Sequence, residues 1–281
     1  MTRVVAADGT AISYKVVGPR HGPPLLALQG LGADARGWTF QRRALASRYR
    51  LILVDNRGVG GSDRPPGPYD LEVMAADALA VLDDLGVGSA HVLGASMGGV
   101  LAQVLGVRHP SRVRSLTLAC TACRHHPWRV ELLGQWRAVA AAEGMAGVSR
   151  VGARWLIGTR TRLRLRTLLE LAGPLALNVP PESFIAQVDA ILSLEDDVRF
   201  ELTEVQVPTL VMVGSQDRLT PLGDAEEIAS LVPGAQLAIL RGGAHGFMVE
   251  QAGTFNRTVR TFLDGLSPVA DRDVDGAAAG A

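Results

Sequence analysis

The stretch HVLGASMGGVLAQVLG, residues 91–106, places one serine between two glycines where an apolar run meets an apolar periodic segment. The run at 91–93 is typical of a buried strand, and 97–107 is typical of a helix. A turn this tight needs small neighbours and forces its central residue into an unfavourable backbone conformation. It also places Ser96 at the N-terminus of the helix, where the helix dipole favours developing negative charge. The spacing G-x-S-x-G therefore predicts a nucleophilic serine.

Other apolar runs without alternation recur along the chain, as expected for strands that helices cover on both faces. They lie at 25–30, 51–56, 91–96, 115–120, 209–214 and 235–240. A turn at Asp8-Gly9 predicts a hairpin before them, over 4–18. Helical patterns separate the strands, at 38–48, 71–85, 97–107, 224–231 and 247–262. This alternation predicts an α/β fold with a mostly parallel central sheet flanked by helices.

The alternation stops over 124–204, where no strand-like run appears. Three of the four tryptophans of the chain fall in this segment. We expect it to form a helical cap over an apolar cavity, inserted into a core made of 1–123 and 205–266. The tail 267–281 has no periodicity and almost no bulky residues, so it is predicted to be disordered.

A serine hydroxyl needs a general base, and the base needs an acid that orients it. Asp217 lies just past a predicted strand, and His245 lies in a glycine-bracketed loop just past the last one. Their order after Ser96 is that of a serine–acid–histidine triad. Asp224 follows Pro221 within a helix, so we expect it at the surface. His91 is expected to be solvated or to cap an element.

An oxyanion hole requires two backbone N–H groups close to the nucleophile. One is expected from Met97, which follows the serine. The other is expected from Leu31 in the loop LQGLGAD, where Gly30 and Gly32 allow a close approach. The substrate pocket is expected to include these two glycines and four tryptophans. The tryptophans are Trp38, Trp128, Trp136 and Trp155.

Over about residues 10–265 the chain resembles an α/β-hydrolase-fold serine hydrolase. The matching pieces are GLGADARGW, VDNRGVGGSDRP, GASMGG, GSQDRLTP and GGAHGF. The stretches 57–87 and 135–156 are similar to the 3-oxoadipate enol-lactonase group. The resemblance implies a Ser96–Asp217–His245 triad, no metal or other cofactor, and an acyl-enzyme mechanism on a small ester or lactone. Gln29 departs from the pattern, because many relatives carry histidine there, and this puts substrate choice in doubt.

The composition of the chain limits the classes of partner that it is expected to bind. Basic and acidic residues both number 28, so the formal net charge is zero and predicts no binding to nucleic acid or to an anionic membrane. The N-terminus lacks the apolar core of a secretory signal, and no uncharged apolar stretch reaches the roughly 20 residues of a membrane span. Cys120 and Cys123 are expected to be free thiols. We expect a cytoplasmic monomer or homodimer.

The sequence leaves several alternatives open. The same triad can serve carbon–carbon bond hydrolysis, acyl transfer or cofactor-free perhydrolysis, although Leu31 is not the aromatic residue that perhydrolase relatives often carry. Outside enzymes, the alternative is a non-catalytic ligand receptor on the same fold. Arginines of the cap either clamp a substrate carboxylate or form a solvated helix face, and the arginine bias of the chain favours the second. They are Arg150, Arg154, Arg160, Arg162, Arg164 and Arg166.

Overall fold

The computed structural model of the chain describes residues 1–159, 161, 179–193 and 196–266. Its strands form one eight-stranded sheet in the order β1-β2-β4-β3-β5-β6-β7-β8. Strand β2 runs antiparallel to β1 and β4, and the other pairs are parallel. This confirms the predicted α/β fold. The strands are β1 (Thr2–Val5), β2 (Ala11–Val17), β3 (Pro24–Leu28), β4 (Arg50–Val54), β5 (Ala90–Ala95), β6 (Val113–Ala119), β7 (Thr209–Gly214) and β8 (Gln236–Leu240).

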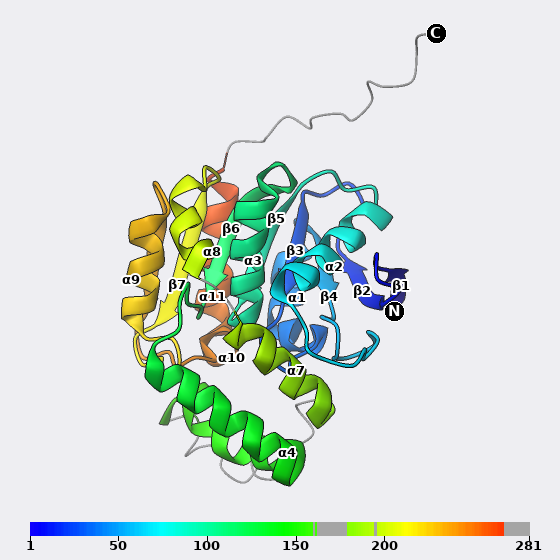
Figure 1. Cartoon of the computed structure of the whole chain (residues 1–281). Helices are drawn as coiled ribbons and strands as arrows, with labels where there is room; N and C mark the ends of the chain where they lie inside the picture. Colours follow the sequence, from blue (N-terminus) through cyan, green and yellow to red (C-terminus); the bar gives the residue numbers. More distant parts are fainter. Residues whose placement is uncertain (160, 162–178, 194–195, 267–281) are drawn as a thin grey trace.

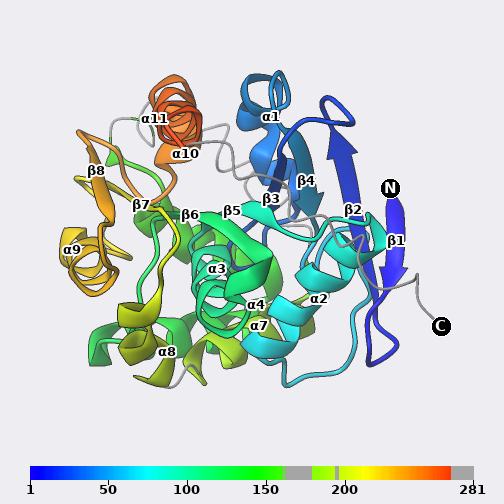
Figure 2. The same ribbon diagram turned by 90° about the horizontal axis from the view of Figure 1, so that it is seen from above.

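Helices cover both faces of the sheet (Figure 2). One face carries α2 (Leu71–Asp84), α3 (Met97–Arg108), α8 (Asp196–Glu201) and α9 (Leu222–Leu231). The other face carries α1 (Thr39–Leu45), α10 (Phe247–Glu250) and α11 (Ala252–Asp264). The short 3-10 helices are η1 (Ala35–Trp38), η2 (Pro110–Arg112) and η3 (Leu202–Glu204).

Two apolar clusters form the core, one on each face of the sheet. Along β3, Leu26 and Leu28 belong to the cluster under α2 and α3, whereas Leu25 and Ala27 belong to the cluster under α1 and α11. Successive side chains of a strand point to opposite faces. A strand buried on both faces is therefore apolar at every position, which is why the sequence shows runs without alternation.

The described part of 124–204 forms helices and no strand. Helices α4 (Pro127–Leu156) and α7 (Pro181–Leu192) lie across one end of the sheet (Figure 1), whereas α8 and η3 follow the face of the sheet. Helix α4 is broken at Gly144, whose φ of 66° and ψ of −165° leave the helical region. The predicted disordered tail, 267–281, lies outside the described residues.

One predicted helix is wrong in its extent. The sequence predicts a single helix over 247–262, but Gln251 has a φ of −127° and a ψ of 41°, which divides the segment into α10 and α11. The side chain of Gln251 donates a hydrogen bond to the Arg241 carbonyl at 3.0 Å, across the loop that carries His245. The interruption thus follows from a contact between segments that periodicity does not register.

Candidate active site

Ser96 joins β5 to α3 in the strained conformation that its motif predicts. Its φ is 55° and its ψ is −119°, although it is not glycine. Its flanking glycines have no room for a side chain. A Cβ on Gly94 would lie 2.1 Å from the Gly98 carbonyl oxygen, and one on Gly98 would lie 2.2 Å from the Leu28 carbonyl oxygen. Close packing of α3 on β3 and β5 therefore keeps Ser96 in its strained backbone conformation.

Three predicted side chains meet beside this turn. The His245 Nε2 atom lies 3.0 Å from the Ser96 Oγ atom. On the other side of the ring, Nδ1 lies 2.9 Å from one Asp217 carboxylate oxygen and 3.2 Å from the other. An ionised carboxylate only accepts hydrogen bonds, so Nδ1 carries the proton and Nε2 presents a lone pair to the hydroxyl. The arrangement can take a proton from Ser96.

The loop after β7 fixes the carboxylate of Asp217. Its Oδ1 atom accepts hydrogen bonds from the Leu219 and Thr220 N–H groups, both at 2.9 Å. The Thr220 hydroxyl donates to Oδ2 at 2.9 Å and lies 3.2 Å from His245 Nδ1. Asp217 and His245 are each 5% exposed. Sequence reasoning missed Thr220, because no pattern in DRLT shows that this hydroxyl reaches the carboxylate of Asp217.

The loop after β3 passes directly over the nucleophile. A Cβ on Gly30 would lie 3.0 Å from the Ser96 Cβ atom. The Ala33 N–H donates to the Gly30 carbonyl at 3.1 Å, which closes a β-turn. Gly32 has a φ of 70°, as the third residue of a type II turn requires. This turn, which we call the oxyanion turn (30–33), has Leu31 at its second position. Met97, the other predicted donor, is the first residue of α3.

The four tryptophans that were predicted to line the pocket do not form one cluster. The prediction that Trp38 lines the pocket is wrong, because its side chain is fully buried and packs against Phe255 on the α11 face of the sheet. Trp136 is buried inside the cap core at 5% exposure. Trp128 and Trp155 stack with their ring centroids 6.2 Å apart.

Trp155 lies close to both triad loops. The guanidinium of Arg218, which follows Asp217 in the chain, lies 5.1 Å from the centroid of the Trp155 ring. Leu156, which follows Trp155, accepts a hydrogen bond at 2.7 Å from the N–H of Gly246, the residue after His245. The end of α4 is therefore in contact with the loops that carry the acid and the base.

Two of the six cap arginines lie in the described residues. Arg150 is exposed and pairs with Glu143, seven residues earlier on α4. Arg154 is exposed with its guanidinium 5.9 Å from the Trp155 ring centroid. Arg150 thus belongs to a solvated helix face. Arg160, Arg162, Arg164 and Arg166 lie outside the described residues.

Asp224 is not the surface residue that the sequence predicts. It is 2% exposed, and its carboxylate pairs with the Arg129 guanidinium, which comes from the start of α4 and is also buried. Burial raises the pKa of this carboxyl, while Arg129 opposes the rise. The Nε atom of Arg129 also donates to the Leu219 carbonyl at 2.9 Å. A buried ion pair and this hydrogen bond thus join the start of α4 to the loop that carries Asp217.

His91 is also more buried than expected. It is 8% exposed in β5, and its Nδ1 atom lies 2.8 Å from the Ser115 hydroxyl. Burial lowers the pKa of the His91 imidazole from its usual 6.5 to about 4. The ring is therefore neutral at physiological pH and takes no part in the site.

Both cysteines are free and buried, so the prediction of free thiols is confirmed. Burial raises the pKa of the Cys120 thiol, and it raises the pKa of Cys123 to about 12. A thiol reacts as its thiolate, so neither is a competing nucleophile at neutral pH.

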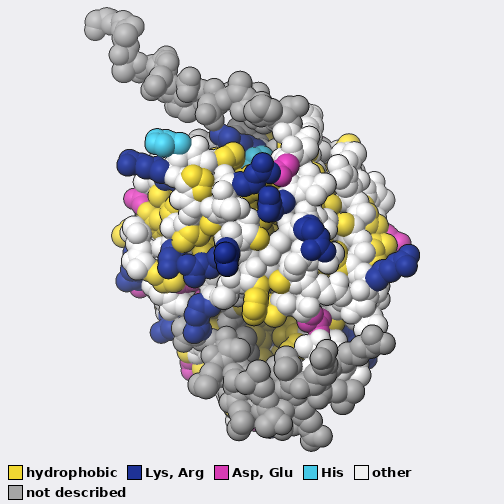
Figure 3. Space-filling view, turned by 180° about the vertical axis from the view of Figure 1, so that it is seen from behind, with side chains coloured by type: hydrophobic (Ala, Val, Ile, Leu, Met, Phe, Trp, Pro, Cys, Tyr) yellow, Lys and Arg dark blue, Asp and Glu magenta, His cyan; other side chains and the backbone are white. Residues whose placement is uncertain are grey.

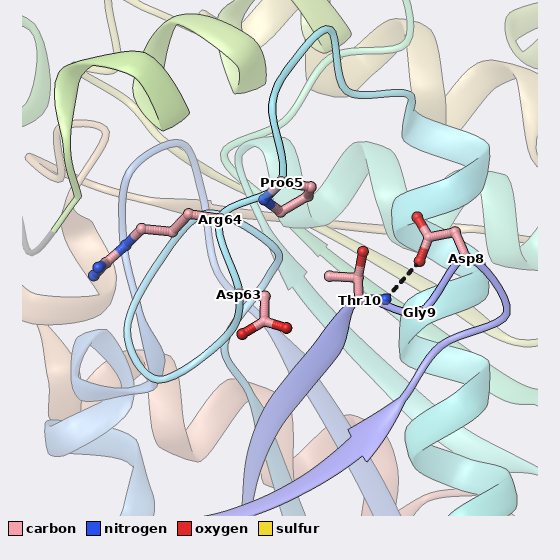
Figure 4. A pocket seen from close by; sticks show the side chains of 6 residues that line it. All are labelled: Asp8, Gly9, Thr10, Asp63, Arg64 and Pro65. Atoms are coloured by element: carbon pink, nitrogen blue, oxygen red, sulfur yellow. Dashed lines mark hydrogen bonds between the residues drawn. The ribbon is translucent and has the colours of Figure 1, made fainter.

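Groups that could serve other chemistry are few. Among the residues described, no three His, Cys, Asp or Glu side chains gather in a way that could hold a metal ion. A surface pocket lies between the β1–β2 turn and the loop after β4, with Asp8, Asp63 and Arg64 in its wall (Figure 4). Asp8 accepts a hydrogen bond from the Thr10 N–H at 3.0 Å, and Asp63 accepts one from Ala11. These contacts hold the hairpin, and no triad residue lines the pocket.

One face of the molecule mixes charged and apolar side chains among the described residues. Seen from behind, Lys and Arg side chains are scattered, with apolar side chains between them (Figure 3). None of the helices in the described part of the chain is long and apolar enough to span a bilayer.

Comparison with known proteins decides the family. Residues 23–143 match the family described as alpha/beta hydrolase fold. A relative from Caulobacter segnis that carries the name carbamate hydrolase RutD is 32% identical over 266 residues, which cover 90% of this chain and 97% of the relative. The chain belongs to the α/β-hydrolase fold family.

Further members of this family are similar to the chain in sequence and in structure. It is 28% identical to 3-oxoadipate enol-lactonase 2 of Acinetobacter baylyi, over 92% of this chain and 95% of that protein. The crystal structure of the enol-lactonase from Burkholderia xenovorans LB400 superposes with a TM-score of 0.87 at 28% identity, covering 94% of this chain and all of that one. The predicted resemblance to the enol-lactonase group is confirmed. At the level of the family, this α/β hydrolase is an ester or lactone hydrolase.

Proposed function

We propose that the chain hydrolyses small carboxylic esters and lactones through an acyl-enzyme on Ser96. The observation that carries the proposal is the 3.0 Å distance between Ser96 Oγ and His245 Nε2, with Asp217 on the far side of the same ring. A nucleophile, a base and an orienting acid in contact form the constellation that activates a serine.

In the first half of the reaction, Ser96 Oγ attacks the carbonyl carbon while its proton passes to His245 Nε2. The carbonyl electron pair moves to the oxygen, and the Leu31 and Met97 N–H groups bind this oxyanion. Asp217 holds the ring and stabilises the imidazolium. The imidazolium then gives its proton to the leaving alkoxide, and the carbon–oxygen bond of the ester breaks. In a lactone the leaving alcohol stays attached to the acyl group.

In the second half, His245 takes a proton from water, and the hydroxide attacks the acyl carbon. The same two N–H groups stabilise the second oxyanion, and Ser96 leaves with the proton from the imidazolium. The relatives are named for carbamate, enol-lactone and ester substrates. All three classes offer a carbonyl carbon bonded to a heteroatom, which this sequence of steps can cleave.

The test is steady-state hydrolysis of p-nitrophenyl acetate and of the lactone dihydrocoumarin. Ser96→Ala is expected to lower kcat for both by about 10⁴-fold or more, because the nucleophile is lost while the fold remains. Ser115→Ala is the control, because this buried hydroxyl lies 2.8 Å from His91 Nδ1 at the start of β5, whereas Ser96 follows the end of that strand. Equal rates for the wild type and Ser96→Ala would reject the proposal and favour a ligand receptor on this fold.

Two further predictions stay predictions. The cytoplasmic location is a proposal that rests on the sequence. That the chain is a monomer or a homodimer is also a proposal from the sequence. Sedimentation of the purified chain would measure its oligomeric state.

A further inference from the structure

Gln187 of α7 connects the cap to two loops of the core. Its side chain is fully buried. The Oε1 atom accepts a hydrogen bond from the Gly32 N–H at 2.8 Å, and the Nε2 group donates to the Arg57 carbonyl at 2.9 Å. A buried amide with both ends bonded has one defined orientation, because exchanging its oxygen and nitrogen would place donor against donor and acceptor against acceptor.

The Gly32 N–H belongs to the central peptide of the oxyanion turn. Turns of types I and II differ by a flip of this peptide, which joins Leu31 to Gly32. The acceptor on Gln187 therefore holds the peptide in the type II orientation. From the core side, the Asn56 Nδ2 group donates to the Gln29 carbonyl at 3.0 Å and holds the entry to the turn.

The same helix also packs on the turn. A Cβ on Gly32 would lie 3.2 Å from the Phe184 ring and 3.3 Å from Val179. The turn is therefore confined between the nucleophile and the cap, with Gly30 against Ser96 and Gly32 against Phe184. Figure 1 shows α7 across the end of the sheet where these loops lie.

We propose that Gln187 is a positioning residue for the oxyanion hole. Through the Gly32 N–H it fixes the turn that presents the Leu31 N–H to the developing oxyanion. The inference rests on the proposed function, since it needs Ser96 as nucleophile and Leu31 as donor. It gives the cap a part in the chemical step.

The physical reason is geometric. A donor of an oxyanion hole acts only when it lies about 2.7–3.1 Å from the position that the oxyanion takes. Without its acceptor, the Gly32 N–H would be left unsatisfied in a buried place, and the turn would relax toward another partner. A displaced Leu31 N–H weakens binding of the transition state while leaving ground-state binding almost unchanged, so kcat falls and KM does not.

The test begins with Gln187→Met, which keeps the length of the side chain and removes both hydrogen bonds. With p-nitrophenyl acetate, kcat is expected to fall by about 10- to 100-fold while KM stays within about twofold, less than the full loss of a donor. Gln187→Glu keeps an acceptor for the Gly32 N–H and is expected to recover part of kcat.

A second readout separates positioning from general loosening of the cap. Ser96 adds to the carbonyl of 1,1,1-trifluoropropan-2-one, so that the Oγ–carbon bond forms, the electron pair moves to oxygen and the serine proton passes to His245. This adduct resembles the tetrahedral intermediate of the acetyl ester. Its inhibition constant is expected to rise in Gln187→Met by the same factor by which kcat/KM falls.

The matched control is Ser183→Ala, one turn earlier on α7. Ser183 is also buried, and its hydroxyl lies 3.5 Å from the Tyr69 hydroxyl. It is not among the nearest neighbours of Gly30 or Gly32 in the oxyanion turn. It is expected to keep the wild-type kcat and inhibition constant. If Gln187→Met does not fold, Gln187→Asn is measured in its place with the same two readouts.

Wild-type kcat and inhibition constant in Gln187→Met, or in Gln187→Asn where it replaces it, would overturn the inference, and so would equal losses in Ser183→Ala. Failure of the proposed function looks different. In that case Ser96→Ala would remain active, whatever the Gln187 variants do.

Discussion

At the scale of single residues, the site depends on groups that hold other groups. Ser96 was predictable from the sequence because a tight turn between strand and helix admits few residue types. Thr220 was not, because nothing in DRLTP says that the hydroxyl reaches both Asp217 and His245. Asp224 and His91 were misjudged, since their burial depends on segments far away in the chain. Local sequence thus predicted Ser96, Asp217 and His245 better than it predicted the side chains that support them.

Thr220→Val tests one such support. Valine keeps the shape of threonine but cannot donate to Asp217 Oδ2, so the carboxylate is held less firmly against His245. We expect kcat/KM for p-nitrophenyl acetate to fall by about 10-fold and the free energy of unfolding to fall by about 1 kcal/mol. Thr220→Ser retains the hydroxyl and should keep most of the activity. A valine variant as active as the wild type would show that the backbone N–H groups alone fix the acid.

His91 predicts a dependence of stability on pH. Its folded pKa of about 4 lies below the unfolded value of 6.5, so the unfolded chain binds a proton first as the pH falls. The free energy of unfolding therefore has its full value above pH 6.5. It falls by about 3 kcal/mol as the pH decreases from 6.5 to about 4. In urea unfolding at several pH values, His91→Gln should lose less stability on acidification than the wild type. The exposed His21→Gln is the control, and identical curves for His91→Gln and the wild type would exclude His91 as the cause.

At the scale of elements, apolar runs and the turn at Asp8-Gly9 predicted every strand of the sheet, and helical periodicity predicted most of the helices on its faces. It could not predict the break at Gln251 or the contacts of α4 and α7 with the core, because each depends on a partner distant in sequence. The cap illustrates the limit. Its helical character was visible in the sequence, whereas the buried polar side chains that join it to the triad loops were not.

The Arg129–Asp224 pair allows this connection to be measured. Arg129→Met leaves a buried carboxylate without its cation, which is expected to cost about 3–5 kcal/mol of unfolding free energy. Removing both charges in Arg129→Met with Asp224→Leu should cost less than the arginine change alone. Denaturant unfolding of both single variants and the double variant gives the coupling energy. Additive losses would mean that the pair does not act as a unit.

At the scale of the whole molecule, the sheet brings together residues from three distant segments. The loops after β5, β7 and β8 lie at one end of the sheet, because parallel strands present their carboxyl ends at the same edge. The order of the triad in the sequence was therefore enough to predict that Ser96, Asp217 and His245 meet. The direction in which the Trp38 side chain points could not be predicted from the sequence. A tryptophan buried under α11 has the same sequence signature as one that lines a pocket.

The most direct test of the central claim is covalent labelling with a fluorophosphonate, followed by peptide mass spectrometry. The activated serine attacks phosphorus and fluoride leaves, so one label is expected per chain, on the peptide that contains Ser96. Asp217→Asn should label about 10²- to 10⁴-fold more slowly, because the imidazole loses its orienting partner. A label on any other residue, or none on the folded wild type, would contradict the account.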